Sequence, residues 1–189
     1  ADGDAALIVR PRGTVWAPYN KDGLYKIGVT NKDYYFAVGA FCAGRSASGI
    51  QATDILEGIR AARTILPDIP VAVVGDGTLA FPALYAAALL GNVEELTLRN
   101  ALVSFEDVTA GRAFMYYLHP EVLAVQGILR WCDIPELTLA SGAKRVAWEN
   151  PLDRNEAPLV ETAFTAFERE VRGLEKVFSC EGKTNILRR

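Results

Sequence analysis

The chain has 189 residues, 50% of them hydrophobic and 23% charged, with a formal net charge of -3 at pH 7. This length predicts a single domain over residues 1–189, and the composition is typical of a packed globular core rather than a disordered chain. The small net charge and the lack of a long single-sign run argue against a nucleic-acid partner. No apolar run is long enough to span a bilayer, so no membrane partner is expected.

The chain begins at Ala1, and its only methionine is Met115. We therefore expect either a lost initiator or a processed piece of a larger domain. No signal peptide is visible, and the sequence leaves the compartment open.

The three cysteines, Cys42, Cys132 and Cys180, lie far apart and form no Cys-x-x-Cys pair. This spacing argues against a structural zinc site, and no other metal and no cofactor is expected. Buried, small hydrophobic side chains are the expected role for all three. A disulfide between two of them stays open.

Short apolar stretches alternate with helical patterns along the chain. We expect strands at 5–9, 71–74, 95–98, 145–150 and 177–180. Helices are expected over 35–66, 79–90 and 158–176, with one or two within 104–130, whereas 14–34 is a surface excursion. This alternation is typical of an α/β fold with a mostly parallel sheet. Ligands of such sheets bind beyond the carboxyl ends of the strands, here at 10–14, 75–80, 99–105 and 149–155.

The stretch "VAVVGDGTLAFPALYAAALLG" (71–91) predicts a strand, a glycine turn and a helix. The strand is apolar throughout, which is typical of a strand covered on both faces. One interpretation is a dinucleotide motif, Gly75-x-Gly77-x-x-Ala80, with phosphate at the helix N-terminus. The next strand ends in Arg99-Asn100 rather than in an acid, which weakens this interpretation and leaves an NADP-type module as one alternative.

The second interpretation is the nucleophile elbow, G-x-S-x-G, in which a serine occupies the strand-to-helix turn. Here Gly77 occupies the serine position, and Thr78 follows it. Three flanking segments agree in order and spacing with the proteins that carry this elbow, namely "LIVRPRG", "GRSASGIQATDILEGIRAARTI" and "ILRWCDIPELTLASGAKRVAWENPLD". From about Ala5 to Pro158, the chain resembles the later half of an α/β-hydrolase, particularly the bacterial acetyl-xylan-esterase-like and prolyl-oligopeptidase-like members.

The resemblance implies a three-layer α/β-hydrolase-like fold and assigns catalytic positions one by one. Asp153 occupies the place of the catalytic acid, although a turn residue that caps the following segment is an equal alternative. The nucleophile position, Gly77, has lost its side chain. No histidine follows the acid, and His119 lies in the wrong chain order, so we expect it at a helix end or on the surface.

The resemblance also predicts a missing strand. In the family, the strand that carries the oxyanion-hole loop lies between the first and second strands of this chain, and nothing here supplies it. The sheet is therefore expected to be incomplete on its N-terminal side. An unpaired apolar strand at 5–9 favours self-association or a partner chain that completes the sheet.

Other candidate residues have plainer explanations. Ser46 lacks the elbow spacing, and we expect Ser48 and Ser104 to cap helices. Adjacent acids such as Glu106 and Asp107 predict a solvated face. Four aromatic residues could line a sugar-binding surface but are more typical of packing: Tyr116, Tyr117, Trp131 and Trp148.

The sequence therefore predicts a hydrolase-like domain that has lost catalysis, a pseudoenzyme that acts as a binding or structural module in a larger assembly. A small ester or carbohydrate is the expected ligand class. The turn formed by Gly75, Asp76, Gly77 and Thr78 keeps N–H groups that could bind an anion. Two alternatives stay open, namely an active esterase completed by another segment or chain, and the dinucleotide-binding module.

Overall fold

The computed structural model describes residues 5–14, 32–67, 69–110, 125–178 and 184–188. Its sheet has four strands: β1 (Ala72–Asp76), β2 (Glu95–Arg99), β3 (Arg145–Glu149) and β4 (Asn185–Arg188). The strands lie in the order β1-β2-β3-β4, and every neighbouring pair is parallel. The α/β fold with a parallel sheet is therefore confirmed.

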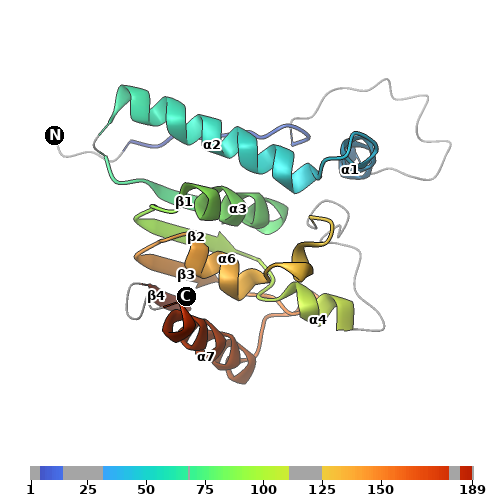
Figure 1. The fold of residues 1–189 in the computed structure, drawn as a ribbon, viewed down its shortest axis with the longest axis vertical. Helices are drawn as coiled ribbons and strands as arrows, with labels where there is room; N and C mark the ends of the chain where they lie inside the picture. Colours follow the sequence, from blue (N-terminus) through green and yellow to red (C-terminus); the bar gives the residue numbers. More distant parts are fainter. Residues whose placement is uncertain (1–4, 15–31, 68, 111–124, 179–183, 189) are drawn as a thin grey trace.

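The helices of the described ranges lie mainly on one face of this sheet (Figure 1). They are α1 (Lys32–Cys42), α2 (Ala47–Ile65), α3 (Ala80–Leu90), α4 (Phe105–Ala110), α6 (Ile134–Ala140) and α7 (Glu161–Val177), with short 3-10 turns η2 (Gly77–Leu79) and η3 (Ile128–Arg130). Helix α3 packs between α2 and α6, and α6 packs on α7. Right-handed crossovers between strands in sequential order place every connecting helix on the same side. The described residues therefore form two layers, and the predicted third layer is not found among them.

The core lies between the sheet and this helix layer. Trp148 of β3 is fully buried, and its ring meets Phe167 of α7 edge-on, with the ring centroids 5.2 Å apart. Phe164, Phe167 and Val171 are all buried on one side of α7. The predicted amphipathic helix is thereby confirmed, because its apolar stripe is the face that covers the sheet.

Strand β1 differs from its expected environment. Val73 is buried, whereas Val74 is 56% exposed, because the helices cover only one face of the sheet. The prediction that both faces are covered is therefore wrong for this strand. On the covered side, a Cβ atom on Gly75 would lie 2.7 Å from both Ala80 Cα and Ala83 Cβ. Glycine thus permits the close approach of β1 and α3.

The N-terminal segment is not the buried strand expected at 5–9. Its residues form no strand, and Leu7 and Ile8 are 58% and 82% exposed. It runs along α2 (Figure 1), where Arg12 forms an ion pair with Asp54 at 2.7 Å. A strand needs a hydrogen-bonding neighbour, and none of the described strands pairs with this segment.

Three local predictions have mixed outcomes. The strand expected at 177–180 is wrong at its first two residues, because Val177 ends α7 and Phe178 caps it, while 179 and 180 lie outside the described residues. The last described strand is β4. Ser46, not Ser48, caps α2, since its Oγ accepts a hydrogen bond from Gly49 N at 3.0 Å. The predicted cap at Ser104 is confirmed, because its Oγ accepts from Asp107 N at 3.2 Å.

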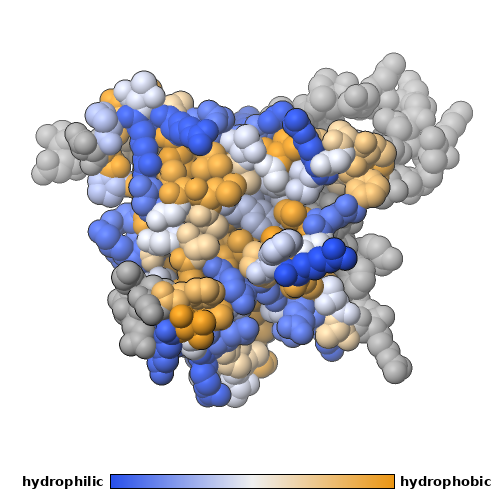
Figure 2. All heavy atoms as spheres, in the orientation of Figure 1, coloured by the Kyte–Doolittle hydropathy of each residue, from blue (hydrophilic) through white to orange (hydrophobic). Residues whose placement is uncertain are grey.

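The surface carries apolar side chains at several element ends. Ile65, at the end of α2, is 78% exposed, and Leu89, near the end of α3, is 73% exposed. Figure 2 shows apolar surface over this part of the helix layer. None of the described helices combines the length and apolar character needed to span a bilayer.

Candidate functional site

The turn between β1 and α3 has the form of an elbow without a reactive side chain. Gly77 directly follows the strand with a φ of +56°, in the left-handed region, and opens the 3-10 turn η2. A Cβ atom at this position would have no neighbour within 4 Å. The position assigned to the nucleophile is therefore sterically open, but it offers no hydroxyl or thiol.

The same turn provides a poor context for a dinucleotide. Gly75 and Ala80 of the predicted motif serve the close packing of β1 on α3. The described strands follow one another across the sheet in chain order, and this order does not reverse beside β1. Among the described strands, β1 therefore borders no topological switch point, which is where dinucleotides bind in such sheets. Arg99, considered for a 2′-phosphate, instead donates through Nε to Glu149 Oε2 at 2.5 Å. Nothing in this geometry favours the dinucleotide alternative.

Polar side chains join the carboxyl ends of three neighbouring strands. Asn150 Nδ2 donates to Asn100 Oδ1 at 2.7 Å, and Asn100 Nδ2 donates to Asp76 Oδ1 at 2.7 Å. Both asparagines have positive φ, +49° and +51°, a conformation that asparagine tolerates better than most residues. Sequence reasoning missed this chain of hydrogen bonds, although an asparagine directly after each of two strands was the available signal.

Asp153, the expected acid, lies in the loop after β3 and forms its own turn. Its Oδ1 accepts hydrogen bonds from Asn155 N at 2.8 Å and from Ala157 N at 3.0 Å. Its backbone N–H also donates to Ala157 O at 2.9 Å. This geometry matches the turn-capping alternative. His119, Tyr116, Tyr117 and Cys180 lie outside the described residues.

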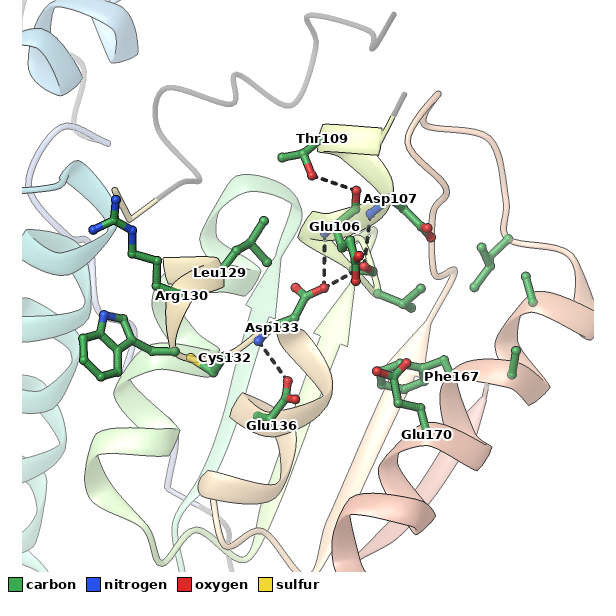
Figure 3. Close-up of a pocket in the computed structure, with 16 residues that line it drawn as sticks. Glu106, Asp107, Thr109, Leu129, Arg130, Cys132, Asp133, Glu136, Phe167 and Glu170 are labelled. Carbon is green, nitrogen blue, oxygen red and sulfur yellow. Dashed lines mark hydrogen bonds between the residues drawn. The ribbon is translucent and has the colours of Figure 1, made fainter. Parts of the chain in front are cut away.

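A cleft of about 680 Å³ lies between α4, α6 and α7 (Figure 3). Helices α4 and α7 follow the loops that leave the carboxyl ends of β2 and β3, so the cleft belongs to the side of the sheet where ligands of α/β folds bind. Its lining includes five acidic residues, namely Glu106, Asp107, Asp133, Glu136 and Glu170. Sequence reasoning missed the cleft because its walls come from segments far apart in the chain.

Asp133 holds the two short helices of the cleft together. Its Oδ1 accepts from Phe105 N and from its neighbour Ile134 N, both at 2.8 Å, and its Oδ2 accepts from Ser104 Oγ at 2.7 Å. Glu136 closes the capping box by accepting from Asp133 N at 2.9 Å. One carboxylate thus caps the N-termini of both α4 and α6, so its role in the wall is structural.

The lining holds four acids besides Asp133 and one basic residue, Arg130, so acidic groups predominate in the cleft. Partial desolvation at the cleft wall raises the pKa of the largely exposed Glu170, and the carboxylates of Glu136, Asp133, Glu106 and Asp107 raise it further. Burial also raises the pKa of the Cys132 thiol, and the nearby carboxylates of Glu136 and Asp133 raise it further. A thiol with a raised pKa stays protonated near neutral pH and is a poor nucleophile. The cleft therefore favours hydrogen-bond donors and disfavours anions.

The described cysteines depart from the expected burial. Cys132 is half-buried in the cleft wall, but Cys42 is exposed at the end of α1, so the prediction of a buried side chain is wrong for Cys42. Both are free thiols. Tyr85 of α3 lies behind the wall. Burial, followed by the charges of Cys132 and Asp133, raises its pKa, and its buried hydroxyl has no hydrogen-bond partner among the described residues.

Two tryptophans have opposite environments. Trp148 belongs to the core, as expected, whereas Trp131 lines the cleft and is 86% exposed. An indole ring left in water is an apolar face available for contact with a ligand. Trp131 thus adds a flat apolar surface to a lining that also contains carboxylates, which are strong hydrogen-bond acceptors.

Across the described ranges, no three His, Cys, Asp or Glu side chains are placed so that they could hold a metal ion. Comparison with protein-family models, with curated proteins and with solved structures found no match to this chain.

Proposed function

We propose that this chain is an α/β-hydrolase-like module that has lost acyl transfer and binds a carbohydrate within a larger assembly. The observation that carries the proposal is the turn at Gly77. A strand leads into a left-handed residue and then a helix, as in a nucleophile elbow, yet the residue on the turn has no side chain. Acyl transfer by this architecture requires an activated nucleophile at that place.

The surroundings of the turn support the loss of catalysis. The Asp153 carboxylate accepts two backbone N–H groups of its own loop, so it is engaged in local structure. Asn100 bonds to Asp76 and Asn150 bonds to Asn100, and neither amide can serve as a base beside Gly77. These contacts stabilise the ends of the strands, which is a structural role for all of these side chains.

The cleft supports a carbohydrate as the ligand. Its volume of about 680 Å³ falls in the range of small-ligand sites. Sugar hydroxyls donate hydrogen bonds to carboxylates, and the C–H face of a sugar ring packs on an aromatic plane. Glu106 and Glu170 offer the first kind of contact, and the exposed ring of Trp131 offers the second.

Calorimetric titration of the intact protein with xylo-oligosaccharides, plain and acetylated, tests the binding proposal. We expect saturable binding that Trp131→Ala weakens at least about tenfold, because the stacking surface is lost. Phe178→Ala is the matched control, since Phe178 is also exposed, at 62%, but does not line the cleft. No saturable binding, or equal loss in both variants, would refute the carbohydrate site.

The active-esterase alternative predicts a different result. A fluorophosphonate probe would label one serine stoichiometrically in the intact assembly if another segment or chain completed a catalytic centre. Our proposal predicts no stoichiometric labelling of this chain. Labelling would overturn the loss of catalysis while leaving the carbohydrate cleft to its own test.

A further inference from the structure

The acids that line the cleft between α4, α6 and α7 fall into two groups. Asp133 and Glu136 accept the hydrogen bonds that cap α4 and α6, so the fold itself uses both carboxylates. Among the described residues, no hydrogen bond or ion pair engages the carboxylates of Glu106, Asp107 and Glu170. Three acids of the lining are therefore available to a ligand.

These three acids belong to two different walls of the cleft. Glu106 and Asp107 lie in the first turn of α4, whereas Glu170 lies on α7. Figure 3 shows the Glu170 side chain pointing from α7 into the space between α7 and α6. The charges of the two walls reach each other, because Glu106 and Asp107 are among the carboxylates that raise the pKa of Glu170. A positive charge placed between the walls would relieve this repulsion, whereas a neutral hydroxyl group would not.

The described part of the lining supplies little positive charge of its own. Arg130 is its one basic residue, and Figure 3 shows the guanidinium directed away from Glu106 and Glu170. No three acids of the described ranges are placed so that they could hold a metal ion. An ammonium group donates up to three hydrogen bonds and demands no fixed coordination geometry, so it suits acids that are spread over two walls. The compensating charge therefore comes from an organic ligand.

We infer that, among carbohydrates, the cleft selects sugars that carry a free amino group. The ammonium group lies between Glu106 and Glu170, and the sugar rings contact apolar residues of the same lining, including Leu129 and Trp131. The inference rests on the proposed carbohydrate function and names its ligand class, an oligomer of a 2-amino-2-deoxy sugar with unacetylated amines. An acetylated amine carries no charge, so the same acids discriminate against it.

The test is calorimetric titration of the intact protein at about pH 6 with a glucosamine trimer and, separately, with its fully N-acetylated counterpart. The amines of the first trimer are charged at this pH. We expect the free amines to strengthen binding at least about fivefold, and we expect added salt to reduce this preference, because both walls are open to solvent. Titrations at about pH 5 in two buffers with different ionisation enthalpies should show proton release with the amino sugar only, because an ammonium beside Glu170 lowers the pKa of that carboxyl group.

Glu170→Gln keeps the shape and the hydrogen-bonding capacity of the side chain but removes its charge. This variant should reduce the preference for the free amines to about twofold. Glu168→Gln is the matched control, since Glu168 lies on the same helix and the substitution changes the net charge equally, but Glu168 does not line the cleft. It should leave the preference unchanged.

Three outcomes would overturn the inference. These are equal affinity for the two trimers, an equal effect of Glu168→Gln and Glu170→Gln, and binding of spermidine as tight as binding of the glucosamine trimer. The last outcome would show that the cleft recognises charge without a sugar. Saturable binding of the N-acetylated trimer at equal affinity would leave the proposed function intact, whereas binding of neither trimer would count against both, so the two failures are distinguishable.

Discussion

The two edges of the sheet are built differently. At β4, Arg188 donates to Glu161 Oε2 at 2.6 Å and to Leu159 O, and its guanidinium lies 5.4 Å from the centroid of the Phe164 ring. β1 has no charged side chain before Asp76 and leaves Val74 exposed. Charged contacts join β4 to α7, whereas β1 presents the exposed Val74 on the face of the sheet that the helices leave uncovered. Among the described strands, β1 and β4 are both edges of the sheet, and they differ in these side-chain contacts.

The largest expected effect on stability concerns the contacts between α7 and the segment that leads into β4. Arg172 Nη1 donates to Thr184 O at 2.7 Å and to Glu175 Oε2 at 2.8 Å, and Glu175 is only 2% exposed. Arg172→Met leaves a buried carboxylate without its charged partner, which should cost about 3 kcal/mol in the free energy of unfolding, measured in urea. The double variant Arg172→Met/Glu175→Met should recover much of this loss. A double variant no more stable than the single would contradict the assignment.

The next largest effect on stability is expected at Gly75, within β1. Gly75→Ala places a Cβ atom 2.7 Å from the backbone of Ala80 and should destabilise the protein by about 2 kcal/mol through overpacking. Gly91→Ala is the control, because Gly91 has a φ of +69° but open space, and only backbone strain of about 1 kcal/mol is expected. Thermal unfolding of both variants checks that Gly75→Ala is the more destabilising substitution. Equal stability of Gly75→Ala and the parent would refute the close approach of β1 and α3.

A smaller effect separates the two edges directly. Val74→Lys should change the free energy of unfolding by no more than about 0.5 kcal/mol, because an exposed residue at a free edge gives up little packing. Leu187 is half-buried on β4, so Leu187→Lys should cost about 1 kcal/mol. Chemical denaturation compares the pair. A larger loss for Val74→Lys would mean that the β1 edge is already covered.

The smallest effect is the pH dependence from the cleft. The folded-state pKa of Glu170 is raised, so its contribution is greatest below the unfolded value of 4.5 and is lost as pH rises through the folded value. Glu170→Gln should remove this decline and stabilise the protein near pH 7. The gain should be at most about 0.5 kcal/mol because the side chain is exposed and screened. Unchanged slopes of stability against pH would contradict the acidic environment.

Sequence patterns predicted the elements that carry strong local signals. The apolar runs at β1, β2 and β3, the helix ending at Gly91 and the stripe of α7 all appear where periodicity and glycine chemistry place them. The N-terminal apolar run has the same local signal as β1, yet it forms no strand, because strand formation depends on a neighbour that the run itself cannot encode. β4 was missed because its four residues are flanked by polar ones.

The candidate site was less predictable than the fold. The glycine turn follows from local chemistry, and its position was predicted from Gly75 and Gly77 alone. The cleft depends on how α4, α6 and α7 meet, and Asp133 joins residues 28 positions apart in the sequence. Trp131 and Trp148 are equally apolar in sequence, and only tertiary packing decides that one is exposed and the other buried.

The most direct test of the central claim is turnover of p-nitrophenyl acetate by the intact protein. The proposal that the turn at Gly77 is an elbow without a nucleophile predicts hydrolysis no faster than the buffer background, with no initial burst. The parent and Gly77→Ala should be indistinguishable in this assay. Robust turnover that one point mutation in this chain abolishes would contradict the claim that the module binds without catalysis.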